Sequence, residues 1–340
     1  MDSILNFTNE ELKIELIGKG YKKFRADQIY LEIYKRYVLS FEEMTEISKL
    51  DRKKLSDEFS FLLPNINEKL SEKETGTTKY SIKLLDDEVI ETVLIFADKR
   101  RTQCLSSQVG CPLGCTFCAT AGLDYKRSLS VSEYISQVLL ICKDYGKRPT
   151  NLVFMGMGEP LLNLDNLIKA IQILIDPSGL DFGLRKITVS TCGLLPELEN
   201  LLIAFPNIGI AVSLNSTFND KRNHMMPINK KYSVEDIFNF LIGKKKLFKR
   251  RPTIEYVLIK DINDSTTEAG NLLRLTGKIR CKINLIPFNP FPGTKYKRAT
   301  EKKISIFKNI LMTGKNAVTF RESAGTDIFA ACGQLARLKK

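Results

Sequence analysis

The sequence has no tryptophan, a single histidine (His224) and no run of about 18 apolar residues, the length that a membrane-spanning helix needs. Its first residues lack the apolar stretch of a secretory signal, and internal repeats and low-complexity segments are also missing. These absences argue against a membrane-spanning or repeat protein. They predict a soluble cytoplasmic protein with no membrane partner.

Acidic residues are outnumbered by basic ones. The chain of 340 residues has 52 Lys and Arg against 39 Asp and Glu, which gives a net charge of +13. Such an excess favours a polyanionic partner such as nucleic acid, although a basic proteome or simple solubility would explain it equally well. The length allows one large domain, or a large domain with a small one, and the 43% of hydrophobic residues predicts a sizeable core.

The first part of the chain is expected to be helical. Residues 1–63 have apolar residues at helical spacing, and Thr8 with Glu11 forms a capping-box pattern. A polar, turn-rich boundary follows at 63–79, and residues 80–96 alternate around an acidic turn as in a β-hairpin. The predicted domains are therefore a basic helical accessory domain at 1–75, a hairpin connector at 76–96 and a core at 97–340.

The core is expected to be an α/β fold. Short apolar runs alternate with helical stretches, which indicates βαβ units, a parallel sheet and a full or partial (β/α) barrel. In such a barrel the functional residues lie at the carboxyl ends of the strands. The predicted strands are 103–108, 151–158, 186–192, 208–215, 253–259, 282–288 and 317–322.

Three of the eight cysteines, Cys111, Cys115 and Cys118, lie close together at spacing C-x3-C-x2-C. A structural zinc site normally has four Cys or His ligands, and neither Cys104 nor His224 fits this spacing as the fourth. A [4Fe–4S] cluster held by three thiolates keeps one iron open for a substrate or cofactor. Both a zinc site and such a cluster are compatible with the pattern, and the spacing favours the cluster.

This segment resembles the radical S-adenosylmethionine (SAM) superfamily, whose mark is C-x3-C-x2-C with an aromatic residue, here Phe117, before the last cysteine. In that superfamily the open iron binds SAM. The sequence Gly-Met-Gly-Glu-Pro at 156–160 resembles the motif that binds the SAM amino group at the end of the second strand. The resemblance therefore implies one [4Fe–4S] cluster held by the three cysteines.

The rest of the chain resembles the RlmN family of RNA adenine methyltransferases. The matching stretches are CLSSQVGC (104–111), MGMGEPLLN (155–163), KITVSTCGLLP (186–196), MPINKKY (226–232), CKINLIPFNPFPG (281–293) and ACGQL (331–335). The resemblance implies methylation of C2 of an adenine in the peptidyl transferase region of 23S rRNA, and of the adenine 3′ of the anticodon in tRNA. It also implies an electron donor such as flavodoxin, and we expect a monomer.

Two alternatives remain open. The related Cfr type methylates C8 of the same rRNA adenine, and only Pro160 and the PFNPFPG pattern at 287–293 favour C2. A protein of another class, a non-catalytic RNA-binding protein with a metal cluster, would not need reactive cysteines outside the cluster.

The family chemistry gives separate roles to two isolated cysteines. C2 of adenine is electron-poor and cannot attack the methyl group of SAM, so the family uses two SAM molecules in each turnover. The resemblance implies that Cys332 is methylated first and that the methyl carbon is then activated by a radical and joined to C2. Cys104 then attacks the sulfur of Cys332 to form a disulfide, and Glu91 accepts a proton. Without the family, Glu91 would be an ordinary exposed strand residue.

Further residues correspond to the SAM contacts of the family: Gly158, Glu159, Ser190, Ser213, Leu214, Asn215 and Asn289. Asn215 stands where the family usually has histidine, and Cys192 stands where it usually has serine. An asparagine can still bind a ribose hydroxyl. We expect no redox role for Cys192, Cys142 or Cys281. The basic run at 244–251 either contacts RNA or is a solvated surface, and the lysine-rich N-terminal domain is the better candidate for holding RNA.

Overall fold

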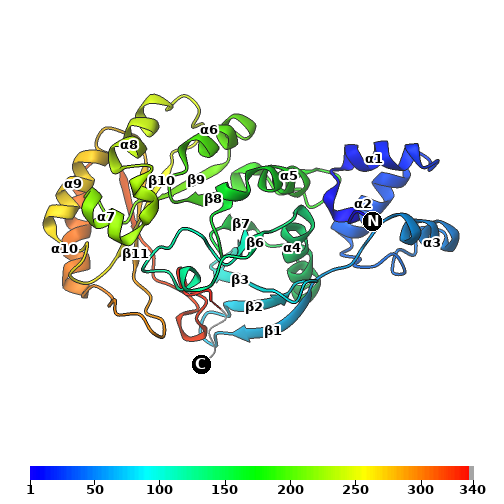
Figure 1. The fold of residues 1–340 in the computed structure, drawn as a ribbon, viewed down its shortest axis with the longest axis horizontal. Helices are drawn as coiled ribbons and strands as arrows, with labels where there is room; N and C mark the ends of the chain where they lie inside the picture. Colours follow the sequence, from blue (N-terminus) through cyan, green and yellow to red (C-terminus); the bar gives the residue numbers. More distant parts are fainter. Residues whose placement is uncertain (337–340) are drawn as a thin grey trace.

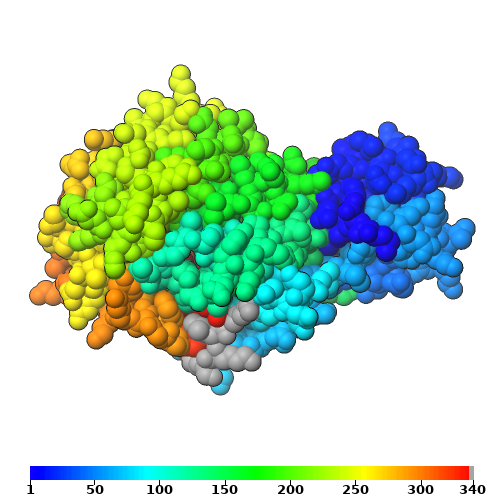
Figure 2. All heavy atoms as spheres, viewed as in Figure 1, coloured from blue at the N-terminus to red at the C-terminus, as the bar shows by residue number. Residues whose placement is uncertain are grey.

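The computed structural model describes residues 1–336, so the last four residues of the predicted core, 337–340, lie outside the described part. The N-terminal region is helical, as predicted, and forms a lobe beside the larger core (Figures 1 and 2). The capping box of Thr8 and Glu11 is present at the start of its first α-helix. Its elements are η1 (Ile4–Asn6), α1 (Asn9–Gly18), α2 (Arg25–Lys35) and α3 (Lys49–Glu58).

The lobe packs on the core through polar and apolar contacts. Asn6 Oδ1 accepts a hydrogen bond from the backbone N of Ser132 at 2.8 Å, and Lys169 lies 3.0 Å from Glu11. The apolar residues of both parts belong to one continuous core cluster, in which Tyr30 and Tyr34 are almost fully buried. Burial of this apolar surface fixes the lobe on the core.

A single sheet of ten strands runs through the core in the order β1-β2-β3-β4-β7-β8-β9-β10-β11-β12. Its first four strands pair antiparallel: β1 (Asn65–Ser71), β2 (Thr78–Lys83), β3 (Val89–Ala97) and β4 (Arg100–Leu105). The predicted hairpin is therefore present as β2 and β3, and it is part of the same sheet as the core. The prediction of a turn-rich boundary at 63–79 was wrong in part, because β1 is an edge strand whose exposed face carries the polar residues.

The remaining strands pair in parallel from β4 to β12. Each predicted core run contains a strand, although the runs at 103–108 and 151–158 continue past the ends of β4 and β7 into the turns that follow. Within the described residues the sheet order ends at β1 and β12, so the barrel is partial, as expected. The strands are β7 (Asn151–Phe154), β8 (Ile187–Thr191), β9 (Gly209–Ser213), β10 (Thr253–Leu258), β11 (Lys282–Pro287) and β12 (Ala317–Phe320), with a short antiparallel pair of β5 (Gln108–Val109) and β6 (Arg127–Ser128).

Helices between these strands cover the outer face of the sheet (Figure 1). They are α4 (Val131–Tyr145), α5 (Leu164–Ile175), α6 (Leu195–Ala204), α7 (Asn219–Met225), α8 (Val234–Gly243), α9 (Thr266–Thr276) and α10 (Glu301–Met312). Short 3-10 turns lie at η2 (Ala119–Gly122), η3 (Pro160–Asn163), η4 (Leu184–Lys186), η5 (Pro227–Lys230) and η6 (Thr326–Ile328). The concave face is left for the side chains of the strands and for the loops that follow them.

Candidate active site

The three clustered cysteines lie on one loop after β5, beyond the end of the first parallel strand. The backbone N of Cys118 donates to the carbonyl of Cys115 at 3.1 Å, and the N of Thr116 donates to the carbonyl of Met225 at 3.0 Å. Gly110 has a φ of +74°, and a Cβ added there would lie 2.3 Å from the carbonyl oxygen of Asp124. Glycine is therefore required at the entrance of this loop.

The three thiols influence one another. Burial raises the pKa of Cys111 to about 12, and the neighbouring thiolates of Cys115 and Cys118 contribute to that rise. Burial also raises the pKa of Cys118. A hydrogen bond from Cys192 is the largest effect on Cys115, and it lowers the pKa of that thiol. Ionised thiols at this spacing need a cationic group to offset their charges.

Within residues 1–336, no three His, Cys, Asp or Glu side chains converge closely enough to hold a single metal ion. The charges of Cys115 and Cys118 both affect the pKa of Cys111, so the three thiols lie near one another. Cysteine thiolates are the usual ligands of iron–sulfur clusters. The side chain of Cys192 contacts this site, which the sequence did not predict.

The Gly-Met-Gly-Glu-Pro turn follows β7 and packs against the end of β4. A Cβ on Gly156 would lie 2.7 Å from the carbonyl oxygen of Leu105. Gly158 has a φ of +95°, and a Cβ there would lie 2.5 Å from Gln108 Cβ. Both glycines are therefore needed for close approach of the two strand ends. The side chain of Gln108 accepts a hydrogen bond from the N of Glu159 at 2.9 Å and fixes the turn.

Glu159 is a buried carboxylate at the end of this turn. Its Oε2 accepts a hydrogen bond from the N of Cys192 at 2.9 Å, and its Oε1 accepts one from the N of Leu161 at 3.2 Å. Burial raises the pKa of Glu159 to about 7, against these hydrogen bonds, which lower it. A carboxylate so placed, with no cationic partner within the described residues, is suited to bind an ammonium group.

Ser190 and Ser213 come together on adjacent strands, with their hydroxyl oxygens 3.5 Å apart. Leu214 is fully buried, its backbone N donates to the carbonyl of Glu255 at 3.0 Å, and its carbonyl accepts from Arg222 at 2.9 Å. Asn215 has a left-handed φ of +59°, a conformation that asparagine tolerates. Its Oδ1 accepts from the N of Val257 at 2.9 Å, so the side chain has a structural bond as well.

Arg222 holds the ends of β8 and β9 together, and sequence patterns gave no sign of it. It is fully buried, and burial lowers its pKa to about 10, which keeps it charged at neutral pH. Its guanidinium donates to the carbonyls of Cys192, Leu214, Ser213 and Tyr232 and to Asn229 Oδ1, at distances of 2.8–3.2 Å.

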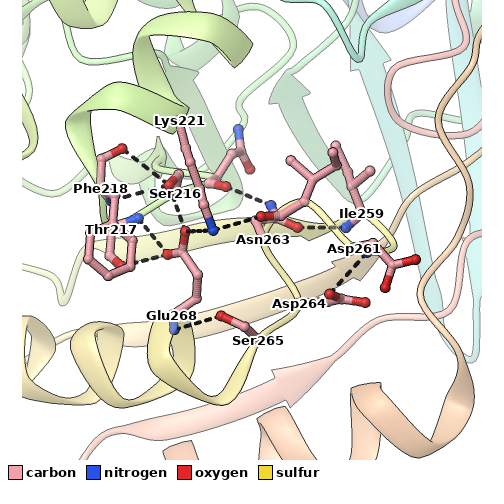
Figure 3. A network of polar contacts seen from close by, with 12 residues as sticks. Ser216, Thr217, Phe218, Lys221, Ile259, Asp261, Asn263, Asp264, Ser265 and Glu268 are labelled. Carbon is pink, nitrogen blue, oxygen red and sulfur yellow. Dashed lines mark hydrogen bonds and ion pairs between the residues drawn. The ribbon is translucent and has the colours of Figure 1, made fainter.

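A polar network around Glu268 fixes the loop that follows β9 (Figure 3). Glu268 is fully buried and accepts hydrogen bonds from Ser216 Oγ at 2.9 Å and from the N of Thr217 at 2.9 Å. Lys221 lies 3.4 Å from the same carboxylate. Asn263 donates to the carbonyl of Asn215 at 2.6 Å. These contacts position the backbone of the predicted Ser213–Asn215 segment.

The two isolated cysteines share one electrostatic environment. Cys104 is buried on β4, and desolvation raises its pKa to about 12. Among the eight cysteines, all in the described part of the chain, only Cys332 is exposed. Nevertheless the surrounding protein desolvates its thiol and raises its pKa, and the nearby charges of Glu255, Cys104 and Cys118 add to that rise. Arg321 acts on both thiols in the opposite direction.

Glu255 was also missed by sequence analysis. It lies on β10, where its strand register pairs it with Ser213 on β9 and with Asn284 on β11. Ser190 Oγ donates to its Oε2 at 3.4 Å, and Asn284 donates to its Oε1 at 3.4 Å. Burial raises its pKa. The concave face thus carries a carboxylate close to both isolated thiols.

Glu91 is buried, and its description as an ordinary exposed strand residue is therefore wrong. The reason is that β3 lies inside the sheet between β2 and β4. Its Oε1 lies 3.1 Å from Nζ of Lys79, and both side chains are buried. Its backbone N donates to Met157 Sδ at 3.3 Å, and its carbonyl accepts from Ser106 Oγ. Glu91 is thus tied to the turn that contains Gly158 and Glu159.

The C-terminal segment crosses the concave side and carries Cys332. Asn289 follows β11, and its Nδ2 donates to the carbonyl of Cys332 at 3.1 Å. The N of Ala119 donates to the carbonyl of Gly333 at 2.8 Å, next to the cysteine loop. Gln334 donates to the carbonyl of Pro290 at 2.7 Å. The predicted methyl carrier is therefore held between the cysteine loop and a predicted SAM contact.

The basic run at 244–251 precedes β10 and so lies at the amino end of that strand. Lys244 lies 2.5 Å from Glu199, and Arg250 donates to the carbonyl of Arg185 at 3.0 Å. The cysteine loop and the Gly-Met-Gly-Glu-Pro turn lie at the carboxyl ends of their strands. The basic run therefore lies at the opposite end of the barrel from these residues.

Comparison with known proteins agrees with this geometry. The radical SAM superfamily matches residues 105–272, and the ribosomal RNA large subunit methyltransferase N-terminal domain matches residues 3–60. A dual-specificity RNA methyltransferase RlmN from Pelobacter propionicus is 43% identical over 331 residues, which are 97% of this chain and 94% of that protein. The chain belongs to the RlmN family.

Other relatives of this RlmN-family chain agree. A probable dual-specificity RNA methyltransferase RlmN from Pseudothermotoga lettingae is 40% identical over 333 residues, 98% of this chain and 97% of that protein. The crystal structure of a radical SAM methyltransferase from Sphaerobacter thermophilus has a TM-score of 0.94 at 35% identity, and covers 98% of this chain and 99% of that one. The predicted family and fold class are confirmed. In residues 1–336 we find no helix with the length and apolarity to span a membrane.

Proposed function

We propose that this RlmN-family chain methylates C2 of an adenine in 23S rRNA and in tRNA through an S-methylcysteine intermediate. The observation that carries the proposal is the shared environment of the two isolated cysteines. Cys332 is exposed beside the cysteine loop, and Cys104 on β4 is near enough to raise the pKa of the Cys332 thiol. A non-catalytic RNA-binding protein would need neither of these thiols. The names of the relatives support RNA as the substrate.

Cys111, Cys115 and Cys118 would hold one [4Fe–4S] cluster. Gly158 and Glu159 would bind the methionine part of SAM, and the loops around Ser190, Ser213–Asn215 and Asn289 would bind the rest. When bound, the cluster and SAM supply a methyl group and a hydrogen-abstracting radical, with two SAM molecules used per turnover. The buried carboxylate of Glu159 supports this assignment, because it is suited to the ammonium group of SAM.

Three residues of the chain would carry out the remaining steps of the reaction. Cys332 carries the methyl group and forms the covalent link to RNA through its methylene carbon. Glu91 accepts the proton that C2 must lose, and its buried Oε2 has no hydrogen-bond partner among the described residues. Cys104, as its thiolate, attacks the sulfur of Cys332 to form a disulfide. The carbon–sulfur bond breaks with its electron pair on the methylene carbon, which takes up a proton and becomes the methyl group. The RNA is released with the former Cys332 methylene carbon attached to C2 as a methyl group.

C2, rather than C8, is favoured by two local sequences. Pro160 begins η3 directly after Glu159, and the PFNPFPG stretch carries Asn289 and Pro290, which both bond the Cys332 segment. We further propose that the N-terminal helical domain contacts RNA and that a donor such as flavodoxin supplies electrons. The chain would act as a monomer in the cytoplasm.

The proposal is tested by mass spectrometry of rRNA fragments and tRNA after anaerobic incubation with the reconstituted protein, SAM and a reductant. We expect one added methyl group on a single adenine, and its position on the base distinguishes C2 from C8. Methylation at C8 would overturn the regiochemistry. Stoichiometric zinc without iron after anaerobic purification would overturn the radical mechanism as a whole.

A further inference from the structure

Lys79 is a buried charged residue that lies in the candidate active site. It is on β2, and its side chain is only 3% exposed. Its Nζ lies 3.1 Å from Oε1 of Glu91, whose side chain is 2% exposed. Burying a single charge is costly, whereas a buried pair offsets much of that cost. The two residues are therefore a mutually dependent ion pair in the interior of the sheet.

Strand register places this pair on the same face of the sheet as Cys104, the cysteine proposed to attack the sulfur of Cys332. Lys79 pairs with Val93 on β3, and Val93 pairs with Cys104 on β4. Paired residues on adjacent strands share a face, and so do residues two apart on one strand. Glu91 is two residues before Val93. Lys79, Glu91 and Cys104 therefore all face the same side of the sheet.

The same lysine also contacts the segment that carries Cys332. Its Nζ lies 3.4 Å from the carbonyl oxygen of Phe329, to which it donates. Nearby, Glu72 Oε2 accepts a hydrogen bond from the N of Gly325 at 2.9 Å. In Figure 1 the red C-terminal segment passes beside β1 and β2, in agreement with these contacts. The β1–β2 hairpin thus supports the chain that leads to Cys332.

The ion pair leaves one carboxylate oxygen of Glu91 available. Oε1 faces Lys79, while Oε2 is buried and has no hydrogen-bond partner among the described residues. An unpartnered buried oxygen is unfavourable unless something else fills its bonding capacity. A substrate C–H that must lose its proton would meet an oriented acceptor at this oxygen.

We propose that Lys79 is a positioning residue, which orients Glu91 so that Oε2 is turned toward the substrate and which joins Glu91 to the Cys332 segment. This inference rests on the proposed function, because Glu91 needs a proton to accept. Once the methylene carbon of Cys332 is bonded to C2, the proton on C2 passes to Oε2 of Glu91. Lys79 exchanges no proton in this step and holds the acceptor in place.

The test compares Lys79→Met with Lys79→Arg and Lys83→Met. Lys83 is a matched control, because it lies on the same strand but is half exposed, with its Nζ 2.6 Å from Asp87. Each variant is purified with its cluster and with cellular RNA. Three quantities are measured: the iron content, the methyl occupancy of the Cys332 peptide, and the fraction of protein covalently bound to RNA on a denaturing gel.

We expect Lys79→Met to keep its iron and its methyl on Cys332, because Asn289, Ala119 and Gln334 still hold that segment. It should release at least about tenfold less methylated RNA, a loss of about 1.4 kcal/mol of transition-state stabilisation, and accumulate the covalent adduct. Lys79→Arg should recover part of the release, and Lys83→Met should match the unmodified protein.

A Glu91→Gln variant separates the loss of an oriented proton acceptor from a folding defect caused by Lys79→Met. Adding Lys79→Met to Glu91→Gln should lower product release no further, because the lysine would assist the proton transfer only through that carboxylate. Its bond to Phe329 is not needed for release, since Asn289, Ala119 and Gln334 still hold the Cys332 segment. Additive losses in the double variant, or normal release by Lys79→Met, would overturn the proposal. If instead the unmodified protein methylates no RNA with any reductant, the proposed function itself fails.

Discussion

Asn289 donates a hydrogen bond of 3.1 Å to the backbone carbonyl of Cys332. The sequence placed these two residues in different roles, one as a SAM contact and one as the methyl carrier. The bond shows that the loop after β11 also fixes the segment on which the proposed methyl carrier lies. A change in this loop should therefore affect the first methyl transfer as well as the binding of SAM.

Asn289→Ala should lower the methyl occupancy of Cys332 in the purified protein while the iron content stays unchanged. Loss of one such hydrogen bond costs about 1 kcal/mol, so the C-terminal segment should become more mobile without global unfolding. Peptide mass spectrometry gives the occupancy, and hydrogen exchange of residues 325–335 gives the mobility. Asn271→Ala on α9 is the control, because the Asn271 side chain accepts a surface hydrogen bond from Arg274 of the same helix. Full occupancy together with normal protection would contradict the structural role of this bond.

SAM binding should strengthen as the pH rises toward neutrality. Burial raises the pKa of Glu159 to about 7, so in mildly acidic solution the empty site holds mostly the protonated acid. In the proposed site the ammonium group of SAM would pair with the ionised form, so binding at low pH would first have to remove this proton. Below the pKa, the dissociation constant measured by calorimetry should fall by up to about tenfold for each unit by which the pH is raised. Glu159→Gln should bind more weakly and without this pH dependence; an identical pH dependence in that variant would assign it to another group.

Arg222→Leu should destabilise the protein strongly. The buried guanidinium satisfies carbonyls at the ends of both β8 and β9, and each one left unpaired costs about 1–3 kcal/mol. We expect a loss of at least about 3 kcal/mol in the free energy of unfolding, measured by denaturant titration of the protein without its cluster. Arg250→Leu is a matched control, because the hydrogen bond of its guanidinium to the carbonyl of Arg185 is exposed. A loss below about 1 kcal/mol for Arg222→Leu would show that water satisfies these carbonyls.

Local patterns were sufficient for the strands and for the cysteine loop. The runs that became β7 to β11 are apolar because parallel strands are covered on one face by helices and pack on the other against the concave interior. By contrast, β1 was missed because polar residues occupy the exposed face of an edge strand. Sequence spacing was enough to predict ligand roles for Cys111, Cys115 and Cys118, because that prediction depends only on neighbours within one loop.

The supporting residues could not be found in this way, because their partners come from distant parts of the chain. Lys79 meets the carbonyl of Phe329, which is 250 positions away. Arg222 lies in a short helix whose sequence gives no indication that it is fully buried. Glu255 is a single acidic residue in an apolar strand run, and only strand register shows that it faces the site with Ser213 and Asn284.

The central claim is that Cys332 and Cys104 act at successive steps, and it is tested most directly by replacing each with alanine. Both variants are purified anaerobically with cellular RNA and run on denaturing gels, with iron content as the measure of an intact site. Cys142→Ala, which removes a fully buried cysteine of α4, is the control for packing losses.

Cys104→Ala should still join its Cys332 methylene carbon to RNA and then stall. It should therefore show a band that survives denaturant and disappears on ribonuclease digestion, with a mass tag left on the Cys332 peptide. Cys332→Ala should show neither adduct nor methylated RNA, because it has no methyl carrier. If Cys104→Ala keeps its iron and shows no RNA bound to Cys332, the division of roles between these two cysteines is wrong.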